Sequence, residues 1–332
     1  MYKVHYFQRK RRQGKNFSLE QIFEDLRRRL TNDYQSNLIE MLFVSSGILK
    51  RILNIFFSFF KQGDVNHITG DINYVNFFLS KRKNVLTILD CGILHRTKGL
   101  RRKIIQLFWF KGPVARSRFV TVISKATKQD LLANVNCNSE KIKVIYVPIS
   151  EKFIYLPKQY NSQRPRILQI GSALNKNLNR LIQATKEMDC TLVIIGEINN
   201  QNYQLLERFK SNYENYVGIS FEEVINQYNL CDLLFFASTF EGFGMPILEA
   251  QATGRPVITS SILSMPEVGG EAAHYVDPYS IDEIQKGIEK INTDSQYRNQ
   301  LIKKGLENVR RFDPKVIANQ YEELYDEICK KL

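Results

Sequence analysis

The sequence predicts an α/β protein with parallel sheets in two domains, and three observations support this fold class. Short apolar segments of strand length alternate with amphipathic helical patterns, which is typical of parallel sheets covered by helices. The 332 residues are enough for two domains, each with its own core. Pro148, Pro157 and Pro165, around a polar segment, mark a linker between the two halves.

Composition excludes several classes of protein. The five cysteines are scattered, with no Cys-x-x-Cys or Cys/His grouping, so neither a disulfide framework nor a zinc site is expected. The first residues, MYKVHYFQRKRR, lack the apolar core of a signal peptide, and no apolar run approaches the roughly 18 residues of a membrane span. We therefore expect a cytoplasmic chain that does not cross a membrane.

The net charge of +13 is unevenly distributed. Residues 1–150 hold 27 Lys and Arg against 10 Asp and Glu, or +17, whereas the remaining residues hold 20 against 24, or −4. Such an excess attracts an anionic partner. A nucleic acid is one candidate, but no recognised nucleic-acid-binding motif supports it. An anionic membrane surface or a lipid-linked acceptor explains the charge better.

The first half begins with an expected strand at residues 4–7. A basic loop containing Gly14 follows, and then an amphipathic helix in which Ser18 and Gln21 form a capping box. Loops after a first strand bind ligands in doubly wound sheets, although a simple connecting turn at Gly14 is equally compatible with the spacing. Further strands are expected at residues 38–44, 65–68, 85–89, 119–123 and 142–146.

Residues 47–62, GILKRILNIFFSFFKQ, form a basic and aromatic helical pattern with two interpretations. The favoured one is a packed helix whose Lys50 and Arg51 extend their charges to water. The other is a helix that lies on a membrane surface or binds a partner.

The second half repeats the alternation. Strands are expected at residues 166–170, 191–196 and 216–218, and helices from Leu178, around residues 203–209 and from residue 220, with Ser220 as a cap. Residues 312–332 carry apolar side chains at helical spacing and predict a final helix.

The most informative stretch is residues 233–259. An apolar strand, residues 233–237, leads through a glycine-containing turn into a helix opened by Pro246. Backbone N–H groups of Phe243, Gly244 and Met245 at this helix N-terminus favour an anion. The nearby carboxylates of Glu241 and Glu249 suit sugar hydroxyls better than a phosphate, because like charges repel. The simpler alternative is a solvated loop acid and a partner of the helix dipole.

This stretch resembles the signature of the retaining, nucleotide-sugar-dependent glycosyl transferases group 1. The resemblance rests on Glu241 and Glu249, the seven residues GFGMPIL between them, and AQATGRPVITS after them. The resemblance extends over nearly the whole chain. It implies the GT-B architecture, with two facing doubly wound (Rossmann-like) domains and a C-terminal helix that crosses back to the first. The implied acceptor domain is residues 1–150, the donor domain residues 151–312 and the crossover helix residues 313–332.

The resemblance also implies a set of site residues. Glu241 and Asp90 would be catalytic, although Asp90 also fits the cap of a turn. The family turn that holds the donor diphosphate commonly carries Arg and Lys, where this chain has Asn175 and Lys176. The donor-binding set is Gly171, Asn175, Lys176, Gly242, Phe243, Gly244, Met245 and Glu249.

One departure from the family concerns the acceptor side. Many relatives carry His-Asp where this chain has Leu89-Asp90, and Leu89 cannot donate a hydrogen bond. His67 and His95 are candidates to replace that histidine, and Gly14 is a third acceptor-side candidate. A lone histidine is more often a structural residue than a ligand.

The resemblance implies a retaining hexosyl transfer from a nucleoside diphosphate sugar to a glycan or lipid-linked acceptor, in cell-surface polysaccharide synthesis. No Asp-x-Asp sequence is present, so we expect no metal, and no cofactor beyond the nucleotide sugar. The alternatives are a non-catalytic subunit that binds nucleotide sugar, or an epimerase or phosphorylase of the same fold. Peripheral contact with the inner face of the cell membrane is compatible with the basic first half.

Overall fold

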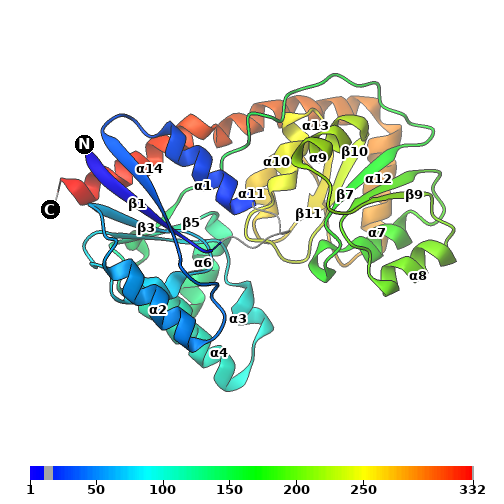
Figure 1. Ribbon diagram of the computed structural model, residues 1–332. Helices are drawn as coiled ribbons and strands as arrows, with labels where there is room; N and C mark the ends of the chain where they lie inside the picture. Colours follow the sequence, from blue (N-terminus) through cyan, green and yellow to red (C-terminus); the bar gives the residue numbers. More distant parts are fainter. Residues whose placement is uncertain (11–17, 331–332) are drawn as a thin grey trace. The chain divides into compact units, whose positions relative to one another are not determined.

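A computed structural model describes residues 1–10 and 18–330, and the chain divides into two compact units (Figure 1). Unit 1 comprises Met1–Pro148 and Asp313–Leu332, and unit 2 comprises Ile149–Phe312. Each unit holds a six-stranded sheet in which all neighbouring strands are parallel. The predicted α/β class with two Rossmann-like units is therefore confirmed.

Unit 1 is built on the strand order β2-β1-β3-β4-β5-β6. The order of strands reverses between β1 and β3, which defines the switch point of this sheet. Its elements are β1 (Tyr2–Gln8), α1 (Ser18–Arg29), β2 (Tyr34–Glu40), α2 (Ile48–Phe59), β3 (Val65–Ile68), η1 (Asn73–Phe77), β4 (Asn84–Ile88), α3 (Gly92–Arg96), α4 (Gly99–Ile105), η2 (Gln106–Lys111), α5 (Gly112–Ala115), β5 (Phe119–Val122), α6 (Lys125–Asn134), η3 (Ser139–Lys141), β6 (Ile142–Val144) and α14 (Pro314–Cys329).

The sheet of unit 1 is covered on both faces because side chains alternate along each strand. In β1, Val4 and Tyr6 face a core shared with α1 and α14, whereas Phe7 faces a second core lined by η1, η2 and α6. The strands are therefore apolar on both sides, as expected for a buried parallel sheet.

The last helix of the chain, α14, is anchored in unit 1 by buried polar groups. Tyr325 accepts or donates hydrogen bonds to Nδ1 of His67 at 2.7 Å and to the hydroxyl of Tyr6 at 2.8 Å. Nε2 of His67 contacts the hydroxyl of Thr87 at 2.7 Å, so both ring nitrogens are satisfied. His67 is fully buried, and burial lowers its pKa to about 3. This network confirms a C-terminal helix that packs on the first unit.

Unit 2 has the strand order β12-β11-β10-β7-β8-β9, which is the 3-2-1-4-5-6 order of a Rossmann fold read from its other edge. Its elements are β7 (Arg166–Ile170), η4 (Leu174–Lys176), α7 (Leu178–Ala184), β8 (Thr191–Ile195), α8 (Asn200–Arg208), β9 (Tyr213–Tyr216), α9 (Phe221–Leu230), β10 (Leu233–Phe236), α10 (Met245–Ala252), β11 (Val257–Ser260), α11 (Met265–Gly269), β12 (His274–Val276), α12 (Ile281–Thr293), α13 (Ser295–Asn308) and η5 (Val309–Phe312).

Two predicted strands lie elsewhere than expected. The strand expected at residues 38–44 is β2, which ends at Glu40. In the segment after it, the side-chain amide of Asn54 bonds both the backbone N–H and the carbonyl of Phe43. The strand expected at residues 216–218 is β9, which ends before Gly218, where φ is +68°. In both places the strand begins earlier than expected, at Tyr34 and at Tyr213, and only the last apolar residues of the expected segment follow its end.

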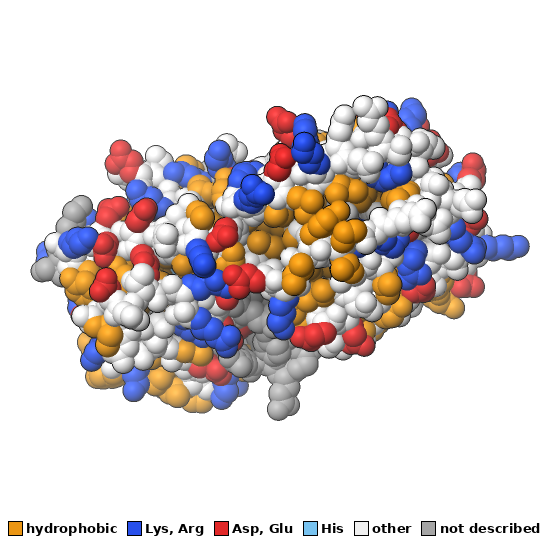
Figure 2. Space-filling model, turned by 90° about the horizontal axis from the view of Figure 1, so that it is seen from above, with side chains coloured by type: hydrophobic (Ala, Val, Ile, Leu, Met, Phe, Trp, Pro, Cys, Tyr) orange, Lys and Arg blue, Asp and Glu red, His pale blue; other side chains and the backbone are white. Residues whose placement is uncertain are grey.

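Charged side chains of both signs are interspersed over the face drawn in Figure 2. Among the helices of the described residues, none has both the length and the apolar character that crossing a bilayer requires.

The depressed pKa of His67 predicts a pH dependence of stability in unit 1. In the folded state His67 stays neutral, whereas in the unfolded state its side chain takes up a proton below about pH 6.5. The contribution of neutral His67 to stability is therefore complete above that pH and is lost as the pH falls. We expect this residue to contribute a loss of up to about 1.4 kcal/mol per pH unit toward pH 4. Trp109, the sole tryptophan, lies in unit 1 and reports its unfolding by urea. The His67→Gln variant should have a lower free energy of unfolding than the native chain near neutral pH, and this free energy should change less with pH. Equal pH dependence of the two proteins would contradict the assignment.

Candidate functional site

The candidate donor site lies at the carboxyl edge of the unit 2 sheet. β7 and β10 are neighbours in parallel register, with Leu168 opposite Leu234, and the strand order reverses between them. The loops that follow the two strands, residues 171–177 and 237–244, therefore emerge side by side at the switch point, where open α/β sheets bind ligands.

Lys176 and Glu241, from these two loops, form an ion pair. Nζ of Lys176 donates to Oε1 of Glu241 at 2.7 Å, and both side chains are largely buried, at 22% and 17% exposed. The ammonium also lies 4.7 Å from the ring centre of Phe236, the last residue of β10. A partly desolvated cation is thus held over the loop by two partners.

Asn175, in the position where relatives commonly carry Arg, holds the second loop in place. Its side-chain amide donates to the carbonyl of Phe240 at 3.0 Å and reaches Oε1 of Glu241 at 3.3 Å. Its carbonyl accepts from the backbone N–H of Thr239 at 2.8 Å. The residue therefore positions Glu241, a role that the sequence analysis did not predict.

Glycine is required at two points of these loops. Gly244 precedes α10 with φ +115°, and Gly171 follows β7 with φ +81°, both in a region that other residues rarely adopt. A Cβ at Gly171 would also lie 3.2 Å from Cγ of Lys176. α10 begins at Met245, with Pro246 in its first turn as predicted, and its N-cap residue, Gly244, makes no side-chain cap bond. Its positive end therefore faces the loop.

Glu249 lies half-buried on α10. Its Oε2 accepts a hydrogen bond of 2.6 Å from the hydroxyl of Tyr228, which is fully buried in α9. Burial raises the pKa of Glu249 to about 7, against the lowering effects of the Tyr228 hydrogen bond and the charge of Lys176. The side chain is therefore poised between its two protonation states near neutral pH.

Three further residues support the site and were missed in the sequence analysis. Asn177 adopts φ +63°, which asparagine tolerates, and its amide donates to the carbonyls of Ala237 and Pro278. The hydroxyl of Ser264 lies 2.8 Å from the carbonyl of Phe243 and 3.2 Å from that of Glu241. Tyr228 is the third. Asn177 could have been recognised from the sequence, because asparagine is common just before a helix. No local sequence pattern marks Ser264 or Tyr228 as residues of the site.

Buried polar atoms without a partner gather where the strands of unit 2 end. Within the described residues, Oε1 of Gln169 in β7, Oγ of Ser238 after β10 and Oγ of Ser260 at the end of β11 have no hydrogen-bond partner. All three residues are fully buried. Such atoms are costly unless a water or a ligand satisfies them.

The acceptor-side candidates lie in unit 1 and do not form one cluster. Asp90 follows β4 and is exposed, and its Oδ1 accepts from the backbone N–H of Gly92 at 2.7 Å, as expected of a turn cap. His95 is exposed on α3, with Nε2 2.8 Å from a carboxylate oxygen of Asp130. His67 is a core residue, and the prediction that it contacts an acceptor is corrected by its complete burial. Gly14 lies outside the described residues.

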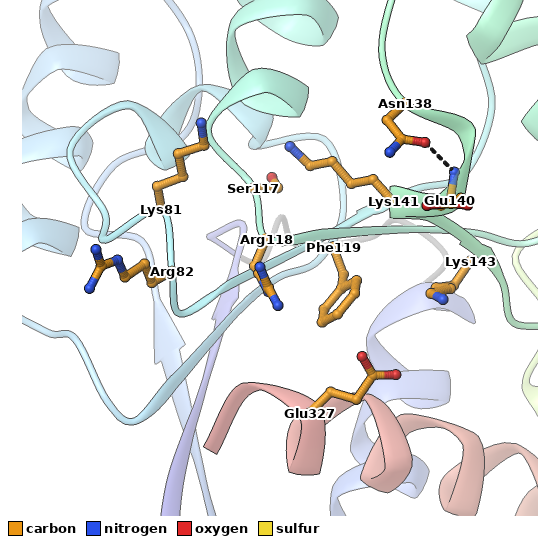
Figure 3. Close-up of a pocket in the computed structure, with 10 residues that line it drawn as sticks. All are labelled: Lys81, Arg82, Ser117, Arg118, Phe119, Asn138, Glu140, Lys141, Lys143 and Glu327. Carbon is orange, nitrogen blue, oxygen red and sulfur yellow. Dashed lines mark hydrogen bonds between the residues drawn. The ribbon is translucent and has the colours of Figure 1, made fainter. Parts of the chain in front are cut away.

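Unit 1 has a basic pocket at the opposite, amino-terminal edge of its sheet (Figure 3). Its volume is about 630 Å³. Burial and the charge of Lys81 lower the pKa of Lys141 in its wall. Because Asp90 follows the carboxyl end of β4, this pocket is separate from Asp90, and His95 does not line it either. The lining residues are Lys81, Arg82, Ser117, Arg118, Phe119, Asn138, Glu140, Lys141, Lys143 and Glu327.

The donor-side residues can together bind an anion beside a hydroxyl-rich group. Lys176 and the N-terminus of α10 provide positive charge, while Glu241 and Glu249 provide hydrogen-bond acceptors. Among the residues that the structure describes, no three His, Cys, Asp or Glu side chains gather into a metal-binding group.

Comparison with known proteins identifies relatives of this arrangement. Residues 156–308 match the model of a family described as Glycosyl transferases group 1. The chain is 28% identical over 212 residues to O-antigen chain mannosyltransferase B of Escherichia coli, covering 60% of this chain and 54% of that protein. It is 25% identical over 242 residues to O-antigen chain mannosyltransferase RfbU of Salmonella typhimurium, covering 69% and 68%. It thus spans about half the length of the first relative.

A solved structure shows the same fold over nearly the whole chain. Anabaena Alr3699/HepE, in complex with UDP and glucose, superimposes with a TM-score of 0.78 at 16% identity, covering 98% of this chain and 100% of that one.

The raised pKa of Glu249 predicts the opposite pH dependence to that of His67. The folded state binds the Glu249 proton more tightly than the unfolded state, so the stabilisation is present below about pH 4.5 and is lost as pH rises through about 7. Glu249→Gln keeps an acceptor for Tyr228 but carries no charge. Calorimetry without ligand would measure the thermal midpoints of this variant and of the native chain. The midpoint of the variant minus that of the native chain should be larger in alkaline than in acidic buffer, by roughly 2–6 °C. Parallel curves for the two proteins would refute this.

Proposed function

Residues 156–308 belong to the glycosyl transferases group 1 family, and on this premise we propose that the chain transfers a hexose-type sugar from a nucleoside diphosphate sugar to a hydroxyl of a glycan or lipid-linked acceptor. The names of the O-antigen mannosyltransferases support a role in cell-surface polysaccharide synthesis.

The observation that carries the proposal is the position of Lys176. Its ammonium lies at the switch point of unit 2, paired with Glu241 from the loop that leads into the N-terminus of α10. A diphosphate bound there meets one cation and one helix N-terminus, which together favour the anion. A carboxylate next to the same cation repels phosphate, so we assign Glu241 to the hydroxyls of the donor sugar and Glu249 to those of the ribose.

The transfer exchanges one bond for another. The bond between the anomeric carbon and the diphosphate oxygen breaks, and the acceptor oxygen bonds to that carbon. The acceptor proton goes to the leaving diphosphate. Negative charge grows on the diphosphate as the bond breaks, so Lys176 and the amides at Gly244 and Met245 stabilise the transition state more than the ground state.

Retention of configuration and independence from a metal are part of the proposal. They rest on the resemblance of the Glu241 to Glu249 segment to the retaining family. Departure of the diphosphate on the same face as acceptor entry would retain the anomeric configuration without a covalent nucleophile. Asp90 remains the proposed catalytic residue of unit 1, where it would orient the acceptor, with His95 as the candidate neighbour.

A transfer assay tests the function. We expect labelled sugar from one member of a panel of nucleoside diphosphate sugars, UDP-glucose and GDP-mannose first, to appear on a glycan or undecaprenyl-linked acceptor. Addition of EDTA should leave the rate unchanged, and the product should keep the donor's anomeric configuration. Conversion of the free nucleotide sugar without acceptor product would instead indicate an epimerase. Binding without any turnover would indicate a non-catalytic subunit.

Lys176→Gln should weaken binding of the nucleoside diphosphate by roughly 10- to 100-fold, because a charge-assisted contact to phosphate is lost. Isothermal calorimetry with the nucleoside diphosphate that stabilises the native chain most would measure it. Lys304→Gln is the matched control, because Lys304 pairs with Glu271 at 2.9 Å on the exposed surface of the same unit. Equal affinity of both variants would remove Lys176 from the donor site.

A further inference from the structure

The two fully buried residues of helix α2 are polar, Ile55 and Phe57 are only partly buried against the core, and most other apolar side chains of the helix are exposed. Asn54 and Ser58 are fully buried, whereas Ile48, Leu49 and the following Phe60 are 76%, 70% and 77% exposed. Ile52, Leu53, Phe56 and Phe59 are also exposed. A surface helix of a globular protein normally has the opposite arrangement.

The orientation of α2 is enforced by specific contacts. The side-chain amide of Asn54 receives the N–H of Phe43 at 3.0 Å and donates to its carbonyl at 2.8 Å, and it also reaches the hydroxyl of Tyr74 at 3.0 Å. Arg51 donates to the carbonyl of Ser45 at 3.1 Å. Rotation of the helix to bury its apolar side would leave these buried groups without partners, which is costly.

A second exposed apolar segment continues this surface. In α4 and η2, Leu100, Ile104, Leu107 and Phe108 recur at helical spacing and are all exposed. The ring of Phe78, which is exposed, stacks on Phe56 of α2 with centres 5.6 Å apart. We call the surface formed by the exposed apolar residues of α2, Phe60, Phe78, α4 and η2 the α2–η2 face.

Two contacts join the halves of the α2–η2 face. The guanidinium of Arg51 in α2 lies 4.6 Å from the ring centre of Trp109 in η2. Phe77, the neighbour of Phe78, lies 6.1 Å from Phe108 between ring centres. The face is therefore continuous, and it is larger than the scattered single exposures that need no explanation.

The charge around the α2–η2 face has one sign. Residues 48–61 and 96–111, which include α2, Phe60, α4 and η2, hold nine Lys and Arg and no acidic residue. The side chains of Lys50, Lys61, Arg101, Arg102 and Lys103 are exposed next to the apolar ones. This differs from the mixed charges on the face in Figure 2.

We propose that the α2–η2 face binds the surface of an anionic lipid bilayer. Its Phe, Leu and Ile side chains enter the boundary between headgroups and acyl chains, while the surrounding Lys and Arg side chains pair with lipid phosphates. A second copy of the chain is a poorer occupant, because two such faces would oppose net positive charges. This inference goes beyond the proposed transfer reaction and does not depend on it.

Vesicle co-sedimentation of the full chain tests the proposal. We expect binding to vesicles of phosphatidylcholine with phosphatidylglycerol, weaker binding to phosphatidylcholine alone, and only partial release by salt because apolar contacts persist. Leu49→Ser with Phe60→Ser should lower the partition coefficient at least roughly tenfold. Trp109 emission should shift on binding of the native chain, because its ring packs under Arg51 of the face.

A matched control variant is Ile154→Ser with Val217→Ser, two exposed apolar residues of unit 2, and it should bind vesicles like the native chain. Circular dichroism and nucleotide binding establish that each variant is folded. Absence of vesicle binding by the native chain, or equal loss in both variants, would overturn the proposal. So would a native dimer in sedimentation velocity that Leu49→Ser with Phe60→Ser converts to a monomer, because a second copy would then occupy the face.

Discussion

The parallel pairing of β7 with β10 is the constraint on which the candidate donor site depends. It brings together two loops whose key residues, Lys176 and Glu241, are 65 positions apart in the chain. The pair is held in place from both sides, because Asn175 donates to the carbonyl of Phe240 and Ser264 reaches the carbonyls of the same loop. A cation and a carboxylate that are both largely buried are tolerable only when they meet, so the strand pairing and the ion pair support one another.

Unit 1 shows a comparable dependence on one distant contact. The chain leaves this unit at Pro148 and returns at Asp313, and Tyr325 of α14 then closes a buried network with His67 and Tyr6. These polar groups are satisfied only while α14 is docked. The final helix is therefore part of the core of the first unit, and its removal would expose both hydrogen-bonding groups and aromatic rings.

Much of the fold could be predicted from local patterns. The strands at residues 65–68 and 166–170, the cap at Ser220 and the helix start at Pro246 follow from apolar runs and capping residues, and each is where the sequence analysis expected it. The strand expected at residues 38–44 ends at Glu40, and the apolar residues that follow lie in a segment where Asn54, from another element, bonds the backbone of Phe43. The strand β12 and the helices α12 and α13 were not predicted, although the capping residues Ser280 and Asp294 were available signals for the starts of the two helices.

The sequence by itself determined the fold class, the linker between the halves and the stretch that carries Glu241 and Glu249, since these depend on patterns within a short window. Only the tertiary structure decided which side chains meet. It placed His67 in the core, gave Asn175 a hydrogen bond to Glu241, and oriented α2 so that Leu49, Leu53, Phe56 and Phe59 are exposed. The physical reason is that a helical or alternating pattern records which residues are apolar, whereas burial and pairing depend on segments that are distant in the chain.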